Sequence, residues 1–187
     1  IPQNINEAIR YLQYASNRNH SESQYFLGYI YYSGKYVPKS IEMAIHYLNL
    51  SSKNNNSNAY FALGYIYGLD NNIDESIYNY NKSSSLDNAF AKNNLAVYYL
   101  KKNNINAAIE LLQKAISLNE NDVYSLFNLA RIYYYGIRVI PSISKAIEMM
   151  ERAFKKNFYL AGLFLYVVYL KGDGAIKNVE KARKIGK

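Results

Sequence analysis

The sequence predicts an all-α fold, a right-handed α-α superhelix (solenoid) built from antiparallel helix pairs. Two short motifs recur along the 187 residues, and both have the spacing of one face of a helix. The first motif is a leucine, a small residue and, four positions after the leucine, a tyrosine; its leucines are 36, 32, 34 and 36 residues apart. Repeats of this length are typical of stacked helix pairs in which each pair contacts only its neighbours.

The first motif marks the first helix of each pair, which we call helix A. Its leading leucines are Leu27, Leu63, Leu95, Leu129 and Leu165. The small residue that follows, such as Gly28 or Ala96, allows close approach of the partner helix, since a larger side chain would hold the two backbones apart. We expect the motif tyrosines to pack in the core; they include Tyr31, Tyr67, Tyr99 and Tyr133.

The second motif marks the second helix of each pair, helix B. It reads Ala-Ile (Ser-Ile in one copy), with a small residue seven positions after the first, and its copies begin at Ala8, Ala44, Ser76, Ala108 and Ala146. In the second copy Ala44, Leu48 and Ser51 stand at i, i+4 and i+7, so we expect one buried stripe.

The two motifs together divide the chain into repeats. We expect a single α-solenoid over 1–187, with the second half of a repeat at 1–20 and repeats at 21–56, 57–88, 89–122, 123–158 and 159–187. Ile1-Pro2 lies 36 residues before Val37-Pro38, which favours a fragment of a longer array.

The links between helices A and B have two lengths. The longer links carry a glycine seven residues after the motif leucine, at Gly34, Gly136 and Gly172, where a helix end with positive φ is expected. In two of them a proline follows, Pro38 and Pro141, which we expect at the start of the next helix. The shorter links, 70–72 and 102–104, contain Asn pairs typical of tight turns.

These motifs resemble the Sel-one-like repeat family, a branch of the tetratricopeptide-like (TPR-like) solenoids. The stretch 21–56 is near the family's full pattern, and 89–122 is more similar to a plain tetratricopeptide repeat. The residues that carry the resemblance in 21–56 are Leu27-Gly28, Tyr31, Gly34, Val37-Pro38, Ala44, Tyr47 and Ser51-Ser52. The resemblance implies an adaptor that assembles protein complexes, with helix A on the concave surface.

Composition excludes several kinds of site. There is no Cys and there are two His, which excludes a disulfide scaffold, a thiol nucleophile and a Cys-ligated zinc site. No grouping of carboxylates or nucleophiles predicts a reaction, so we expect no enzyme activity, no cofactor and no metal. We also expect no membrane span, because the longest apolar stretch, 159–170, is shorter than the about 20 residues a helix needs.

The positions of the 22 tyrosines predict a binding groove. Counted from the small residue of each A motif, the groove positions carry mostly aromatic side chains, which give large contact area and keep a hydroxyl for hydrogen bonding. The predicted groove residues are Tyr25, Tyr29, Tyr32, Phe61, Tyr65, Phe90, Asn93, Tyr124, Phe127, Arg131 and Tyr134. The sequence therefore predicts a scaffold that holds a protein or peptide partner within a larger complex.

Charge distribution supports an alternative partner. Residues 1–137 carry a net charge of +1 and residues 138–187 carry +7, so the C-terminal repeats could dock RNA or another polyanion. The cations concerned include Arg152, Lys155, Lys156, Lys181, Arg183 and Lys184. A further alternative is that the array is the tail of a larger multidomain enzyme.

The sequence leaves two cellular compartments as alternatives. No signal peptide is visible, but the chain opens at Ile1-Pro2 rather than Met, as a piece cut from a longer chain would, so this observation does not fix the compartment. Of the two compartments considered we favour the cytoplasm. Four Asn-x-Ser sequons, beginning at Asn19, Asn49, Asn55 and Asn81, keep the endoplasmic reticulum lumen as an alternative.

Overall fold

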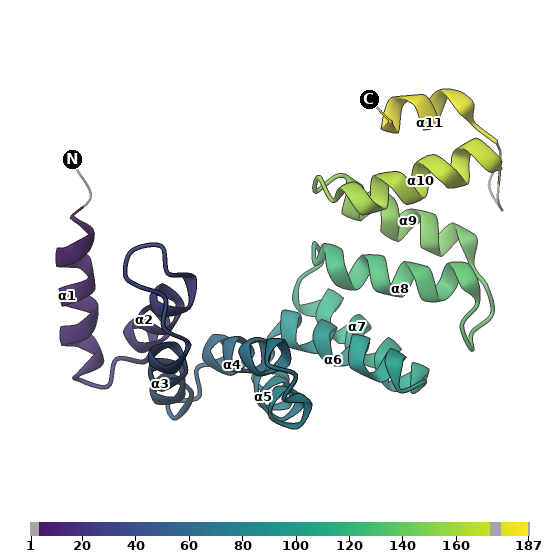
Figure 1. Ribbon diagram of the computed structural model, residues 1–187. Coiled ribbons are helices and arrows are strands. Elements are labelled where there is room, and N and C mark those ends of the chain that lie inside the picture. The colour runs from purple at the N-terminus through teal and green to yellow at the C-terminus, as the bar shows by residue number, and fades with distance from the viewer. Residues whose placement is uncertain (1–3, 173–176, 187) are drawn as a thin grey trace. The chain divides into compact units, whose positions relative to one another are not determined.

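The computed structural model describes residues 4–172 and 177–186, and this part of the chain is helical with no β-strand (Figure 1). Ile1 and Pro2, used above to place the chain start in a link, lie outside the described residues. The helices are α1 Ile5–Ser16, α2 Ser21–Ser33, α3 Ile41–Ser52, α4 Ser57–Leu69, α5 Ile73–Ser85, α6 Ala89–Lys101, α7 Ile105–Leu118, α8 Val123–Tyr135, α9 Ile143–Phe154, α10 Tyr159–Lys171 and α11 Val179–Ile185.

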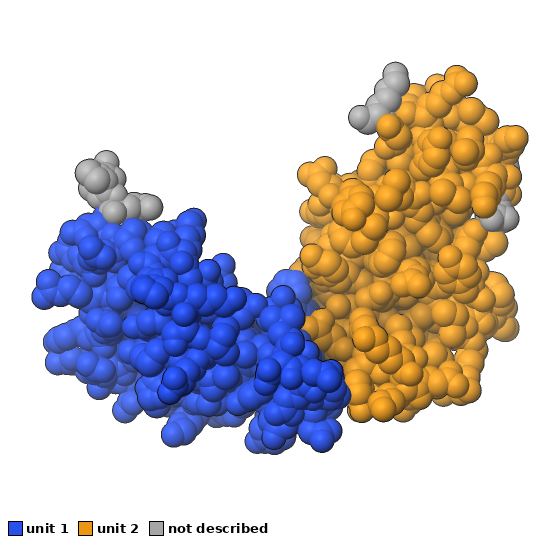
Figure 2. All heavy atoms as spheres, in the orientation of Figure 1, with its two compact units in different colours: residues 1–91 blue, residues 92–187 orange. Residues whose placement is uncertain are grey.

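The helices pack in sequence order, as a solenoid of helix pairs requires. Within repeats α2 packs on α3, α4 on α5, α8 on α9 and α10 on α11. Between repeats α1 packs on α2, α3 on α4, α7 on α8 and α9 on α10. The chain divides into two compact units, residues 1–91 and 92–187, which are coloured separately in Figure 2.

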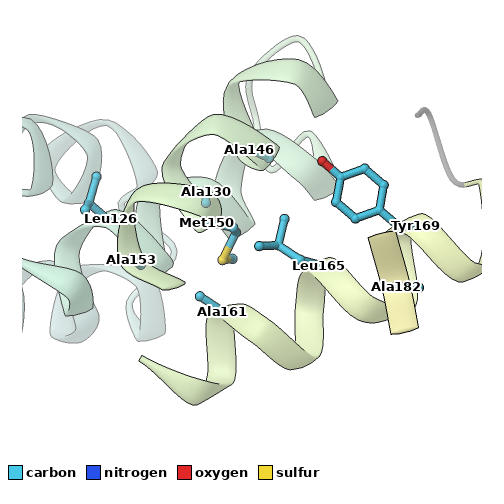
Figure 3. Close-up of a cluster of buried hydrophobic side chains, with 9 residues drawn as sticks. All are labelled: Leu126, Ala130, Ala146, Met150, Ala153, Ala161, Leu165, Tyr169 and Ala182. Atoms are coloured by element: carbon cyan, nitrogen blue, oxygen red, sulfur yellow. The ribbon is translucent and has the colours of Figure 1, made fainter. Parts of the chain in front are cut away.

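The core of each unit is made by the predicted motif residues. In unit 1 the stripe of Ala44, Leu48 and Ser51 is buried, together with Leu27. In unit 2 one cluster of nine buried residues joins α8, α9, α10 and α11 (Figure 3). Leu126, Met150 and Leu165 are its largest aliphatic members, and the other aliphatic members are alanines.

Small residues set the distance between paired helices. A Cβ built on Gly28 would lie 2.6 Å from Leu48 Cγ and 3.2 Å from the Ala44 carbonyl oxygen. Those separations are shorter than the about 3.5 Å of ordinary carbon contacts, so α2 and α3 approach as they do because position 28 has no side chain.

Residues with a left-handed backbone conformation end these helices at the predicted positions. Gly34, Gly136 and Gly172 have φ of 65°, 63° and 79°, as expected for glycine after a helix. The short links use Asn71 and Asn103, with φ of 59° and 60°, because asparagine tolerates this conformation better than most residues.

The predicted place of the two prolines is wrong. Pro38 and Pro141 precede the helices, which begin at Ile41 and Ile143 after the N-cap residues Ser40 and Ser142. Ser40 explains the offset, because its hydroxyl accepts a hydrogen bond from the Met43 backbone N–H at 3.2 Å, a role that proline cannot fill.

Candidate functional site

Five of the predicted groove residues line one apolar pocket in unit 1. The pocket has a volume of about 250 Å³. We call it the tyrosine pocket, and its lining residues are Tyr25, Tyr29, Tyr32, Leu48, Phe61, Ala62, Tyr65 and Ile66.

Helices α2 and α4 supply the aromatic walls of the tyrosine pocket. Tyr25, Tyr29 and Tyr32 stand at i, i+4 and i+7 on α2, so they share one face of that helix. Phe61 and Tyr65 are four residues apart on α4. Helix α3 reaches the pocket through Leu48, which is the same side chain that packs against Gly28.

The rings differ in how far they reach into solvent. Tyr29 and Tyr65 are 58% and 45% exposed, while Tyr25, Tyr32 and Phe61 are half-buried. The rings of Tyr32 and Tyr65 meet edge to face with their centroids 6.1 Å apart. The pocket therefore combines an apolar interior with exposed aromatic edges, an arrangement that holds a large apolar side chain well.

Two tyrosines of the pocket, Tyr25 and Tyr32, have raised pKa values. Burial raises the pKa of Tyr25 above its ordinary value, and the nearby Glu22 and Tyr29 raise it further. Burial also raises the pKa of Tyr32, and the adjacent Tyr65 adds to the shift. Both hydroxyls thus keep their protons and can donate to a carbonyl oxygen of a bound peptide.

The remaining predicted residues of repeat 89–122 do not line this pocket. Phe90 is exposed, and its ring centroid lies 5.9 Å from that of Phe61. Asn93, in unit 2, is 8% exposed and its Oδ1 accepts a hydrogen bond from Asn128 Nδ2 at 2.9 Å. The Asn93 side chain therefore forms a hydrogen bond within unit 2 and does not line the tyrosine pocket.

The predicted groove residues of repeat 123–158 form an aromatic cluster with two partners that the sequence frame misses. Tyr124 and Phe127 both pack against Phe158, at centroid distances of 5.4 Å and 5.5 Å. The ring of Tyr134 meets Phe164 at 4.8 Å. The Arg131 guanidinium lies 5.8 Å from the Phe127 ring centroid.

The sequence frame misses Phe158 and Phe164 because it counts only positions on one face of each A helix. Phe158 is the residue before the first turn of α10, so counting along the helix does not reach it. Leu48, Ala62 and Ile66 are missed for another reason, since helical periodicity assigns buried residues to the core without showing that a cavity opens above them.

The basic C-terminal residues are partly paired within the chain. Lys181 Nζ lies 2.6 Å from Glu151 Oε1, and Arg152 Nη2 donates to the Glu120 carbonyl oxygen at 2.7 Å. Lys184 Nζ lies 3.1 Å from Glu180 Oε1. Among the described residues, three of the six cations considered for polyanion binding thus have partners within the chain.

The structure offers no site for two other kinds of function within its described part. Across residues 4–172 and 177–186 there is no cluster of three or more His, Asp or Glu side chains that could hold a metal ion. No helix in these ranges is both long and apolar enough to cross a bilayer.

Similar solved structures share the fold. A protective antigen of uropathogenic Escherichia coli with an SLR fold superposes with a TM-score of 0.90 at 23% identity, over 99% of this chain and 41% of that protein. This chain thus spans about two fifths of that antigen's length. A Sel1 repeat protein from Oxalobacter formigenes gives a TM-score of 0.86 at 21% identity, over 96% of this chain and 76% of the other. No curated protein matches the sequence significantly.

The family models match nearly the whole sequence. The Sel1 repeat model matches residues 1–20, 21–56, 57–88, 123–158 and 157–185, and a tetratricopeptide repeat model matches 89–122. The resemblance seen in the motifs is therefore confirmed, and so is the predicted TPR-like α-solenoid. The chain belongs to the Sel1 repeat family.

Proposed function

We propose that this chain is a non-catalytic scaffold that holds a protein or peptide partner, and that the tyrosine pocket takes a large apolar side chain of that partner. Sel1 and tetratricopeptide repeat proteins are generally protein-interaction scaffolds. The proposal that the tyrosine pocket takes an apolar side chain rests on the apolar cavity between α2 and α4, which is walled by five aromatic residues.

The energetics of the pocket support this role. Tyr29 and Tyr65 expose aromatic area that a partner would remove from water, at about 25 cal/mol per Å² of apolar surface. Tyrosine loses little conformational freedom on binding, which explains its frequency at interface hot spots. Because three of the six C-terminal cations have intramolecular partners, we give the pocket precedence over a polyanion-binding surface.

A random-peptide display screen on the immobilised chain tests the proposal. We expect the enriched peptides to share a large apolar residue, and Tyr29→Ala/Tyr65→Ala to weaken their binding about tenfold or more, since each hot-spot truncation costs over about 1 kcal/mol. Both side chains are exposed, so the double variant should keep its helicity.

The matched control is Tyr135→Ala/Tyr159→Ala, which removes two exposed tyrosines from unit 2. This control should bind the selected peptides as the unaltered chain does. Peptides that lack a shared apolar residue, or equal binding by the two double variants, would contradict the assignment of the tyrosine pocket.

A further inference from the structure

Unit 1 carries a second cavity whose lining differs chemically from that of the tyrosine pocket. It has a volume of about 600 Å³ and lies between α3 and α5, over α4. None of its residues lines the tyrosine pocket. We call it the acidic groove, and the argument uses six of its lining residues: Tyr60, Tyr67, Asp74, Glu75, Tyr78 and Asn79.

Three tyrosine rings form the aromatic part of the acidic groove. Tyr60 and Tyr67 are seven residues apart on α4 and share a face of that helix. Tyr78 on α5 is exposed. Faces of aromatic rings attract cations, because the π electrons make the ring face negative.

Two carboxylates lie beside these rings without a cation of their own. Asp74 and Glu75 occupy the first turn of α5 and are exposed. Within residues 4–172 and 177–186 neither side chain forms an ion pair. The groove therefore has two negative charges available to a ligand, although the chain as a whole carries a net charge of +8.

A buried amide adds an acceptor to the groove. Asn79 is only 6% exposed, and its Nδ2 donates to the Glu75 carbonyl oxygen at 2.8 Å. The Oδ1 of Asn79 accepts no hydrogen bond from any described residue. This oxygen is not among the buried side-chain atoms that lack a partner, so solvent reaches it from the groove and an N–H group of a ligand can replace that water.

A lysine of the chain lies near one ring of the acidic groove. Lys82, one turn after Tyr78 on α5, has its Nζ 5.7 Å from the Tyr78 ring centroid. Lys82 does not line the groove and forms no ion pair with Asp74 or Glu75, so it leaves their charge available.

We infer that the acidic groove binds an arginine side chain of a basic peptide segment. A guanidinium is planar, so it stacks on a tyrosine ring while its N–H groups donate to a carboxylate and to an amide oxygen. The groove supplies ring faces, two carboxylates and the free Asn79 Oδ1 on neighbouring helices. The inference is independent of the tyrosine pocket, which has no carboxylate in its lining.

The test uses a capped tetrapeptide with one arginine and the same peptide with citrulline, which keeps the shape and removes the charge. NMR of the ring resonances of Tyr60, Tyr67 and Tyr78 locates binding. We expect the arginine peptide to shift these resonances, and Asp74→Asn/Glu75→Gln to weaken its affinity about tenfold. The matched control, Glu120→Gln/Glu148→Gln, makes the same charge change in unit 2 and should leave the affinity unchanged.

Any one of four results would overturn the inference. The citrulline peptide or a lysine peptide could bind as tightly as the arginine peptide. Asp74→Asn/Glu75→Gln could leave the affinity unchanged, or the control variant could lower the affinity by the same factor. A thermal melt shows whether each variant folds, and Tyr78→Phe should retain binding that Tyr78→Ala loses if the ring face is the contact.

Discussion

The close approach of α2 and α3 predicts that Gly28→Ala destabilises unit 1, although alanine is the better helix former. The new Cβ would lie 2.6 Å from Leu48 Cγ and 3.2 Å from the Ala44 carbonyl oxygen. Leu48 is 1% exposed, so it has little free space into which it can move.

The magnitude follows from two opposing effects. Overpacking of a core costs about 1–3 kcal/mol, and exchanging glycine for alanine inside a helix gains about 1 kcal/mol. We therefore expect a net loss of about 1 kcal/mol in the free energy of unfolding. Because Leu48 also lines the tyrosine pocket, its displacement should weaken peptide binding there as well.

A double-mutant cycle with Leu48→Ala separates the clash from other effects. Removing the Leu48 side chain removes the atom nearest the new Cβ, so in that background Gly28→Ala should be neutral or stabilising. The assay is urea unfolding followed by circular dichroism, with hydrogen exchange of the α2 and α3 amides to place the change. Equal effects of Gly28→Ala in both backgrounds would refute the reasoning.

Three further changes have predicted outcomes. Gly34→Ala should cost about 1–2 kcal/mol in urea unfolding, because position 34 has φ of 65° and a Cβ there would also meet Lys39; an unchanged midpoint would argue against strain. Leu165→Ala, at a position 1% exposed, should cost about 2–5 kcal/mol by the same measurement, and a loss below 1 kcal/mol would mean that the core of Figure 3 collapses around the gap. The hydrogen bond from Lys181 lowers the pKa of Glu151, and a second one from Tyr169 lowers it further, against the effect of burial. The stability from this contact is thus present above the ordinary carboxyl pKa and lost as pH falls through the lowered one. Thermal melts of the unaltered chain and Glu151→Gln should therefore converge on acidification, and a gap independent of pH would contradict this.

The repeated helix pair could be predicted from the sequence because it depends on local physics. Leucine, a small residue and tyrosine at helical spacing can bury only one face, and an unburied face must meet a neighbouring copy. Glycine at 34, 136 and 172 has positive φ for a similarly local reason. The prediction that the prolines begin the next helix was wrong. Ser40 follows Pro38 and is the better N-cap, so the helix begins after Ser40.

The helical frame could predict which aromatic residues share one face of an A helix, but it could not predict which of them enclose a cavity. Tyr25, Tyr29, Tyr32, Phe61 and Tyr65 meet around one pocket because α2 and α4 lie near enough for their side chains to converge. Asn93 fits the same frame and yet is buried, since Asn128 on α8 reaches it.

The sequence by itself determined the helical solenoid, its repeats, and the surplus of positive charge after residue 137. Tertiary structure alone decided that Asp74 and Glu75 stand beside three tyrosines, and that Lys181 and Arg152 have partners already. The physical reason is that helical period and turn chemistry act over a few residues. The contacts of Lys181 with Glu151 and of Arg152 with Glu120, in contrast, join residues 30 and 32 positions apart, which only helix packing brings together.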